Sequence, residues 1–163
     1  MLTQDALTRI YYSLSYPNLI YCHADWGSAV TTKTKRVVTA QMRALRTIGC
    51  LGRGEHTNDI FSSLNVLKFP DINTYCCSLY VYKSINSLIE NRYLNFRNND
   101  YHHLRNPDLL RLPQVRSTQS QSFIGFHGVR VWNGLPFDIR SKPSVHSFKS
   151  ALKTYLLSQY SVR

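Results

Sequence analysis

DINTYCCSLYVYKSINSLIEN, which spans residues 71–91, is apolar on nearly every side when it is drawn as a helix. A helix on a protein surface keeps one polar face, whereas a helix that is apolar all round is buried between other helices. Pro70 directly precedes the stretch, and proline is favoured at the start of a helix. We therefore predict a buried central helix over about 71–91, with Tyr75 and Leu79 inaccessible to solvent.

Two further helical regions are predicted before this one. Residues 2–15 carry apolar side chains at helical spacing. Pro17 interrupts that helix, because a proline disfavours the α conformation of the residue before it, here Tyr16. Helix then resumes at Pro17 and continues to about Trp26. Residues 33–51 form the most regular amphipathic helix of the chain.

The segments after the amphipathic helix complete a mostly α fold. The remaining predicted helices are residues 58–65, capped by Thr57 or Asn58; residues 126–134, ended by Gly134; and residues 145–160, capped by Ser144. Polar, turn-prone runs favour an extended connector at 92–124, with or without short strands. We therefore predict a small helical bundle over 1–91, an extended polar and basic connector over 92–124, and a C-terminal segment over 125–163 that packs on the bundle.

The length and composition are those of one globular domain, or of a domain with an appendage. The chain has 163 residues, 43% of them hydrophobic, which suffices for a core and excludes a disordered chain. No apolar run approaches the ~18 residues of a membrane span. Asp5 and Arg9 stand where a secretory signal would be apolar. Four cysteines without metal-ligand spacing favour free thiols in a reducing, intracellular compartment, either nucleus or cytoplasm.

Residues that support catalysis are not concentrated anywhere in the sequence. Two-metal chemistry needs clustered carboxylates, but none of the nine acidic residues is adjacent to another. The chain has no glycine-rich loop that fits a phosphate, and the pairs His102-His103 and Cys76-Cys77 lack zinc-ligand spacing. We therefore expect no catalytic residue, no metal site and no cofactor, so that the chain alone is not an enzyme.

Positive charge is gathered in two blocks. The chain has 20 basic and 9 acidic residues, a net charge of +11. Residues 31–53 contribute +6 and residues 92–163 contribute +8, whereas residues 1–30 and 54–91 contribute −1 and −2. A localised positive field favours a polyanion, above all nucleic acid, over a merely solubilising surface.

The first basic block coincides with the helix at 33–51, which Thr31 or Thr32 can cap. One arc of this helix is apolar and the opposite arc is purely cationic, formed by Lys35, Arg36, Arg43 and Arg46. No acidic residue stands four positions away to relieve the repulsion. Phosphate, or an acidic patch elsewhere in a parent protein, would compensate this charge. The second block offers Arg140, Lys142, Lys149 and Lys153 as further contacts.

Two stretches carry a resemblance to a known family. The first is Tyr16-Pro17-Asn18-Leu19-Ile20-Tyr21, followed by Trp26-Gly27 and by a basic helix with Gln41 and Arg46. The second is Val129-Arg130-Val131-Trp132-Asn133-Gly134-Leu135-Pro136, followed by Ser147-Phe148-Lys149 and by Leu152-Lys153. Their order and spacing resemble the C-terminal thumb and post-thumb region of reverse transcriptases from non-LTR, jockey-like retrotransposons. The resemblance spans nearly the whole chain, but the catalytic fingers and palm of the family have no counterpart here.

The resemblance implies a catalytically inert C-terminal fragment of an RNA-directed DNA polymerase, whose ancestral role is to grip the template–primer backbone. In that role the cationic arc at 33–51 would bind RNA or an RNA–DNA duplex weakly and without reading its sequence. The resemblance also implies an apolar face that once packed on the palm, and such patches promote self-association. The alternative is a structural or protein-interaction remnant that binds no nucleic acid.

Overall fold

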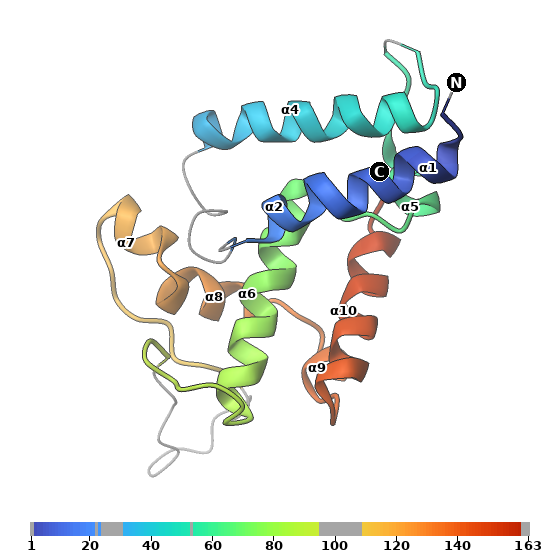
Figure 1. Cartoon of the computed structure of the whole chain (residues 1–163). Helices are drawn as coiled ribbons and strands as arrows, with labels where there is room; N and C mark the ends of the chain where they lie inside the picture. The colour runs from blue at the N-terminus through green and yellow to red at the C-terminus, as the bar shows by residue number, and fades with distance from the viewer. Residues whose placement is uncertain (1, 22, 24–30, 53, 95–108, 161–163) are drawn as a thin grey trace, which may run out of the picture.

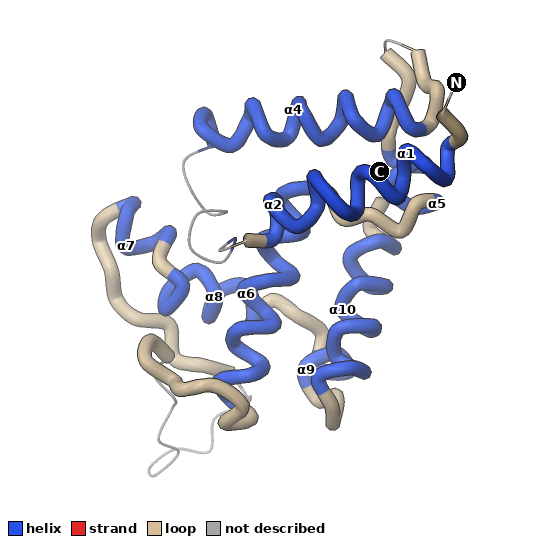
Figure 2. The backbone as a smooth tube through the Cα atoms, in the orientation of Figure 1, coloured by secondary structure: helices blue, strands red, loops and turns tan. Residues whose placement is uncertain are grey.

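The computed structural model describes residues 2–21, 23, 31–52, 54–94 and 109–160. These residues form helices joined by loops and contain no strand (Figure 2), which confirms the mostly α fold. None of the described helices combines the length and the hydrophobicity that crossing a membrane requires. The predicted end of a helix at Trp26 and the His102-His103 pair lie outside the described residues.

Figure 1 shows how the elements follow one another along the chain. They are α1 (Gln4–Ile10), the π-helical turn η1 (Tyr11–Ser15), α2 (Tyr16–Ile20), α4 (Thr31–Ile48), α5 (Asn58–Ser63), α6 (Phe69–Ile85), α7 (Thr118–Ser122), α8 (Ile124–Asn133), α9 (Phe137–Arg140) and α10 (Val145–Ser158). Ser144 caps α10 as predicted, because its hydroxyl accepts from the Ser147 amide, and Gly134 ends α8. Thr57 precedes α5 but makes no side-chain hydrogen bond to cap it. Thr31 and Thr32 are the first residues of α4 rather than its cap.

Helix α6 is the central element, as the sequence predicts. It contacts α2, α4, α8 and α10, which surround it in Figure 1. It ends at Ile85 rather than near Asn91, because Ser87 adopts a left-handed conformation with φ of 54° and the Leu88 amide turns back to the Lys83 carbonyl. Tyr75 and Leu79 are half-buried, so the prediction that they are inaccessible to solvent is wrong.

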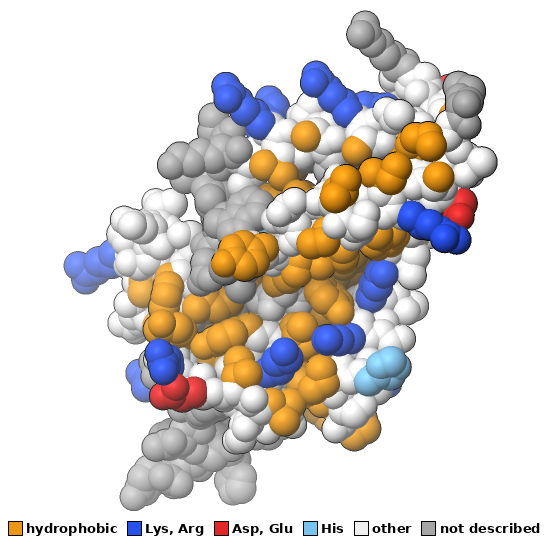
Figure 3. Space-filling view, in the orientation of Figure 1, with side chains coloured by type: hydrophobic (Ala, Val, Ile, Leu, Met, Phe, Trp, Pro, Cys, Tyr) orange, Lys and Arg blue, Asp and Glu red, His pale blue; other side chains and the backbone are white. Residues whose placement is uncertain are grey.

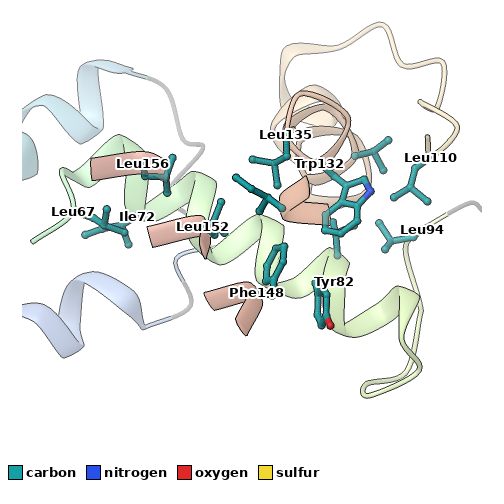
Figure 4. Packing of buried hydrophobic residues seen from close by; sticks show 13 residues of the cluster. Leu67, Ile72, Tyr82, Leu94, Leu110, Trp132, Leu135, Phe148, Leu152 and Leu156 are labelled. Carbon is teal, nitrogen blue, oxygen red and sulfur yellow. The ribbon is translucent and has the colours of Figure 1, made fainter. Parts of the chain in front are cut away.

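The larger of two hydrophobic clusters joins α6 to α8, α9 and α10 (Figure 4). The Phe148 ring of α10 stacks on the Tyr82 ring of α6, with ring centroids 4.3 Å apart. Trp132 of α8 lies beside both rings, with its centroid 5.9 Å from that of Phe148. The C-terminal helix and the central helix therefore share one core.

The smaller cluster joins η1, α4 and α5 to the end of the chain, and it includes Tyr11, Leu45 and Phe61. Tyr160 closes it, because its hydroxyl donates to Asp71 Oδ2 (2.6 Å) and accepts from the Lys68 amide (2.9 Å). Since Lys68 and Asp71 flank the start of α6, these bonds attach the C-terminal end to the central helix.

The helical path does not break at Pro17. Tyr16 has the α conformation, with φ −64° and ψ −40°, so the predicted interruption is wrong. The five preceding residues form the π-helical turn η1, and the Tyr16 amide bonds the Tyr11 carbonyl, five residues back. A wider turn accommodates a residue without an amide hydrogen and moves its ring away from the carbonyl four residues earlier.

The predicted extended connector is helical in part. The Ser/Thr/Gln-rich run forms α7, because the Ser117 hydroxyl accepts from the Ser120 amide and caps the turn. Residues 111–116 have no regular secondary structure. Within its described residues the connector is therefore irregular at 111–116 and helical from Thr118.

Candidate nucleic-acid interface

Helix α4 presents the two opposite faces that its sequence predicts. Leu45 and Ile48 are buried against the smaller cluster, and Val37 and Val38 are half-buried. Their spacing keeps them on one side of an 18-residue helix, so the basic residues lie on the other side. Packing of the apolar face therefore fixes the direction in which the cationic face points.

Three of the four cationic residues predicted on α4 are exposed: Lys35, Arg36 and Arg43. Together with Thr39 and Ala40 they line an open hollow of about 530 Å³. Neither of the two ion pairs found among the described residues involves them. Blue side chains accordingly follow the edge of the molecule that α4 forms (Figure 3). One face of α4 therefore borders the hollow with three cations that form no ion pair within the described part of the chain.

Arg46 differs from the other three. It is half-buried, and one terminal nitrogen (Nη2) donates to the Glu55 carbonyl at 3.4 Å. Its Nε is buried and has no hydrogen-bond partner among the described residues. Arg46 thus contacts the loop between α4 and α5, and it does not line the hollow. The same helical face was predicted for all four residues, but a neighbouring loop covers only this one.

Gln41 is a polar residue on the buried side of α4, and its role is structural. Its Nε2 donates to the Tyr11 hydroxyl (3.1 Å) and to the Leu67 carbonyl (2.9 Å). Its Oε1 accepts from the Phe69 amide at 2.8 Å. One side chain therefore joins α4 to η1 and to the start of α6, which holds the cationic helix in a fixed orientation.

The second predicted group lies on α9, α10 and the loop between them, away from α4. Figure 1 places α4 across one end of the molecule and α9 at the opposite end. Arg140 is half-buried and its Nε donates to the Leu135 carbonyl at 3.1 Å. Lys149 is exposed, whereas Lys142 and Lys153 are half-buried, and burial lowers the pKa of Lys153. The two groups do not form one continuous strip.

The Trp-Asn-Gly-Leu-Pro motif has a structural explanation at each residue. Trp132 and Leu135 are buried in the larger cluster, and Gly134 ends α8. The Asn133 side chain bonds both the amide (3.0 Å) and the carbonyl (2.9 Å) of Leu110. Pro136 precedes α9. The motif therefore holds the end of the connector and the turn between α8 and α9, and it brings no reactive side chain to a site.

Two histidines lie at the junction of α2, α6 and α8. His127 Nε2 lies 2.6 Å from Asn73 Oδ1, and its Nδ1 lies 3.3 Å from a terminal nitrogen of Arg130. His23 is buried, with Nδ1 2.6 Å from the Leu19 carbonyl. Burial lowers the pKa of both histidines, and Arg130 lowers that of His127 further. Both rings are therefore neutral contacts between helices near neutral pH.

The described residues contain no group of three or more His, Cys, Asp or Glu side chains that could hold a metal ion. Cys76 and Cys77 are free thiols, and burial raises the pKa of Cys76 to about 11, so it stays protonated near neutral pH.

No family model, curated protein or solved structure matches the chain. Sequence reasoning missed Thr39 and Ala40 as lining residues of the hollow, although their spacing from Lys35 and Arg43 places them on the same helical face.

Proposed function

We propose that the chain binds the sugar–phosphate backbone of nucleic acid through the exposed cationic face of α4, as a catalytically inert C-terminal fragment of a retrotransposon RNA-directed DNA polymerase. The observation that carries the binding proposal is the hollow lined by Lys35, Arg36 and Arg43, which form no ion pair with any described acidic residue. The family origin is supported by the order of the two motifs that include Pro17 and Trp132.

The dimensions of the cationic face suit a few phosphates. Lys35 and Arg43 are eight residues apart, which is ~12 Å along a helix. A duplex presents one phosphate per ~3.4 Å of axis on each strand, so three cations can meet two or three phosphates. Contacts of this kind position a nucleic acid without reading its bases. We expect weak, sequence-independent binding, with Kd on the order of 10⁻⁴ to 10⁻⁶ M at physiological salt.

Arg46 has a smaller part in this proposal than the sequence suggests, because the loop at Glu55 covers it. The second basic group also has a smaller part, since Arg140 is bonded within the protein and Lys142 and Lys153 are half-buried. The α4 face is the better candidate because its three cations are exposed and adjacent.

The experiment is a titration of a labelled RNA–DNA hybrid across a series of salt concentrations. The test variant is Arg36→Ala with Arg43→Ala, and the matched control is Arg111→Ala with Arg116→Ala. Both variants remove two exposed arginines and so change the net charge equally. Each phosphate contact contributes ~0.9 to the log–log slope, so the test variant should flatten the slope by up to ~2 and bind up to ~60-fold more weakly at 0.1 M salt.

The control should keep the wild-type slope. Equal losses in both variants would mean that net charge, rather than the α4 face, determines binding. An unchanged test variant, with binding lost on Lys142→Ala and Lys149→Ala, would assign the interface to the second group. Wild-type protein that does not bind the hybrid even at low salt would support the alternative function, a structural or protein-interaction remnant.

A further inference from the structure

The first helix exposes an apolar stripe that no described element covers. Leu2, just before α1, is 62% exposed; Ile10, at its end, is 44% exposed; and Leu14, in η1, is 65% exposed. The opposite side of the same helix packs on the smaller cluster through Leu7 and Tyr11. The helix therefore has two apolar faces. One packs on the smaller cluster and the other, the stripe, is exposed.

The π-helical turn keeps this stripe together. In a regular α-helix, residues four apart are ~40° out of line, and the deviation accumulates over successive turns. A π-helical turn takes more residues per turn, so it reduces this deviation where it occurs. Ile10 directly precedes η1 and Leu14 lies within it, and the two therefore stay on one side of the helix.

The charges around the stripe distinguish it from the rest of the surface. The chain has a net charge of +11, but residues 1–30 contribute −1. Asp5 and Arg9 lie beside the stripe as an exposed ion pair, with Arg9 Nε 3.0 Å from Asp5 Oδ2. Two strongly cationic copies of the chain can therefore approach here with less repulsion than at either basic block.

We propose that two copies of the chain associate through the stripe of Leu2, Ile10 and Leu14, with their first helices antiparallel about a two-fold axis. In an antiparallel pair the same flank of both helices meets, so Asp5 of each copy approaches Arg9 of the other. In a parallel pair opposite flanks would meet, so Asp5 and Arg9 of one copy would not face Asp5 and Arg9 of the other. The order of acid and base along the helix is therefore self-complementary only in the antiparallel arrangement.

The association should be weak. From Leu2 to Leu14 the stripe extends ~18 Å at 1.5 Å per residue. A contact of this length buries less than the ~1,200 Å² at which stable interfaces begin, so we expect a dimer Kd on the order of 10⁻⁵ to 10⁻⁴ M. The cationic face of α4 is not part of the contact, so the proposal is independent of the proposed function.

Sedimentation equilibrium of two charge-reversal variants tests the arrangement. Asp5→Arg and Arg9→Asp each place like charges opposite one another, so each alone should dimerise at least ~10-fold more weakly than wild type. An equimolar mixture of the two variants restores opposite charges at both contacts and should associate about as strongly as wild type. Since Arg9→Asp lowers the net charge, an association governed by overall repulsion would instead become stronger in that variant.

Leu14→Gln should also weaken the dimer ~10-fold or more, whereas Leu88→Gln, which changes a 55% exposed leucine beyond the end of α6, should leave it unchanged. Circular dichroism of each variant checks that the fold is retained. Wild-type protein that stays monomeric up to ~1 mM would overturn the proposal, since that concentration exceeds the expected Kd. So would a mixture of the two charge variants that associates no better than either one alone.

Discussion

Replacing Phe148 with alanine tests whether the C-terminal helix and the central helix share one core. Phe148 is completely buried. Its ring packs against Tyr82 of α6, 4.3 Å away at an interplanar angle of 21°, and against Trp132 of α8, 5.9 Å away. The alanine variant therefore removes the aromatic contact between α10 and the other two helices.

The expected cost follows from how little the surroundings can relax. A Phe→Ala change in a packed core costs about 3–5 kcal/mol, from lost burial and from the cavity that remains. Tyr82 cannot move freely into the space, because its hydroxyl donates to the Lys142 carbonyl at 2.7 Å. We therefore expect the upper part of this range, ~4–5 kcal/mol. At roughly 2–4 °C per kcal/mol, the melting temperature should fall by about 8–20 °C.

Urea unfolding followed by far-ultraviolet circular dichroism measures this loss. The matched control is Phe137→Ala, because Phe137 is 58% exposed and its loss should change stability by less than ~0.5 kcal/mol. Phe148→Leu keeps most of the buried volume and should cost less than ~1.5 kcal/mol. A loss below ~1 kcal/mol in Phe148→Ala would refute the shared core, since no completely buried ring is removed so cheaply.

Two further predictions concern polar groups inside the protein. Gln41→Leu removes the buried hydrogen bonds of this side chain to the Phe69 amide, the Leu67 carbonyl and the Tyr11 hydroxyl, and should cost ~2–4 kcal/mol in urea unfolding. The exposed Gln121→Leu should cost less than ~0.5 kcal/mol, and equal costs would contradict the role of Gln41. Burial lowers the pKa of His23 and His127, so below pH ~6.5, the ordinary pKa of histidine, the unfolded chain binds more protons than the folded chain. The free energy of unfolding should therefore be highest above that pH and fall as the pH drops below it. Urea midpoints across this range measure the fall, which should be smaller in His127→Gln, and a fall of the same size in that variant would show that His127 does not contribute.

Local sequence rules account for much of the fold and for the existence of the candidate interface. The spacing of Val37, Leu45 and Ile48 predicts both the apolar side and the cationic side of α4, because the direction of a helical side chain depends only on its position in the turn. Ser144 and Gly134 predict a helix start and a helix end, since capping involves groups within four residues. These features do not depend on any distant part of the chain.

Tertiary structure determines which of these side chains are exposed and can contact a ligand. Arg43 and Arg46 share a helical face in the sequence, but the loop at Glu55 covers Arg46 and leaves Arg43 exposed. The continuous helical path through Pro17 needed a π-helical turn, which apolar periodicity does not reveal. Packing between residues far apart in the chain likewise separates the two basic groups. It also determines that the stripe at Leu14 stays exposed. A local pattern gives the direction of a side chain, whereas its exposure depends on segments that only the folded chain brings beside it.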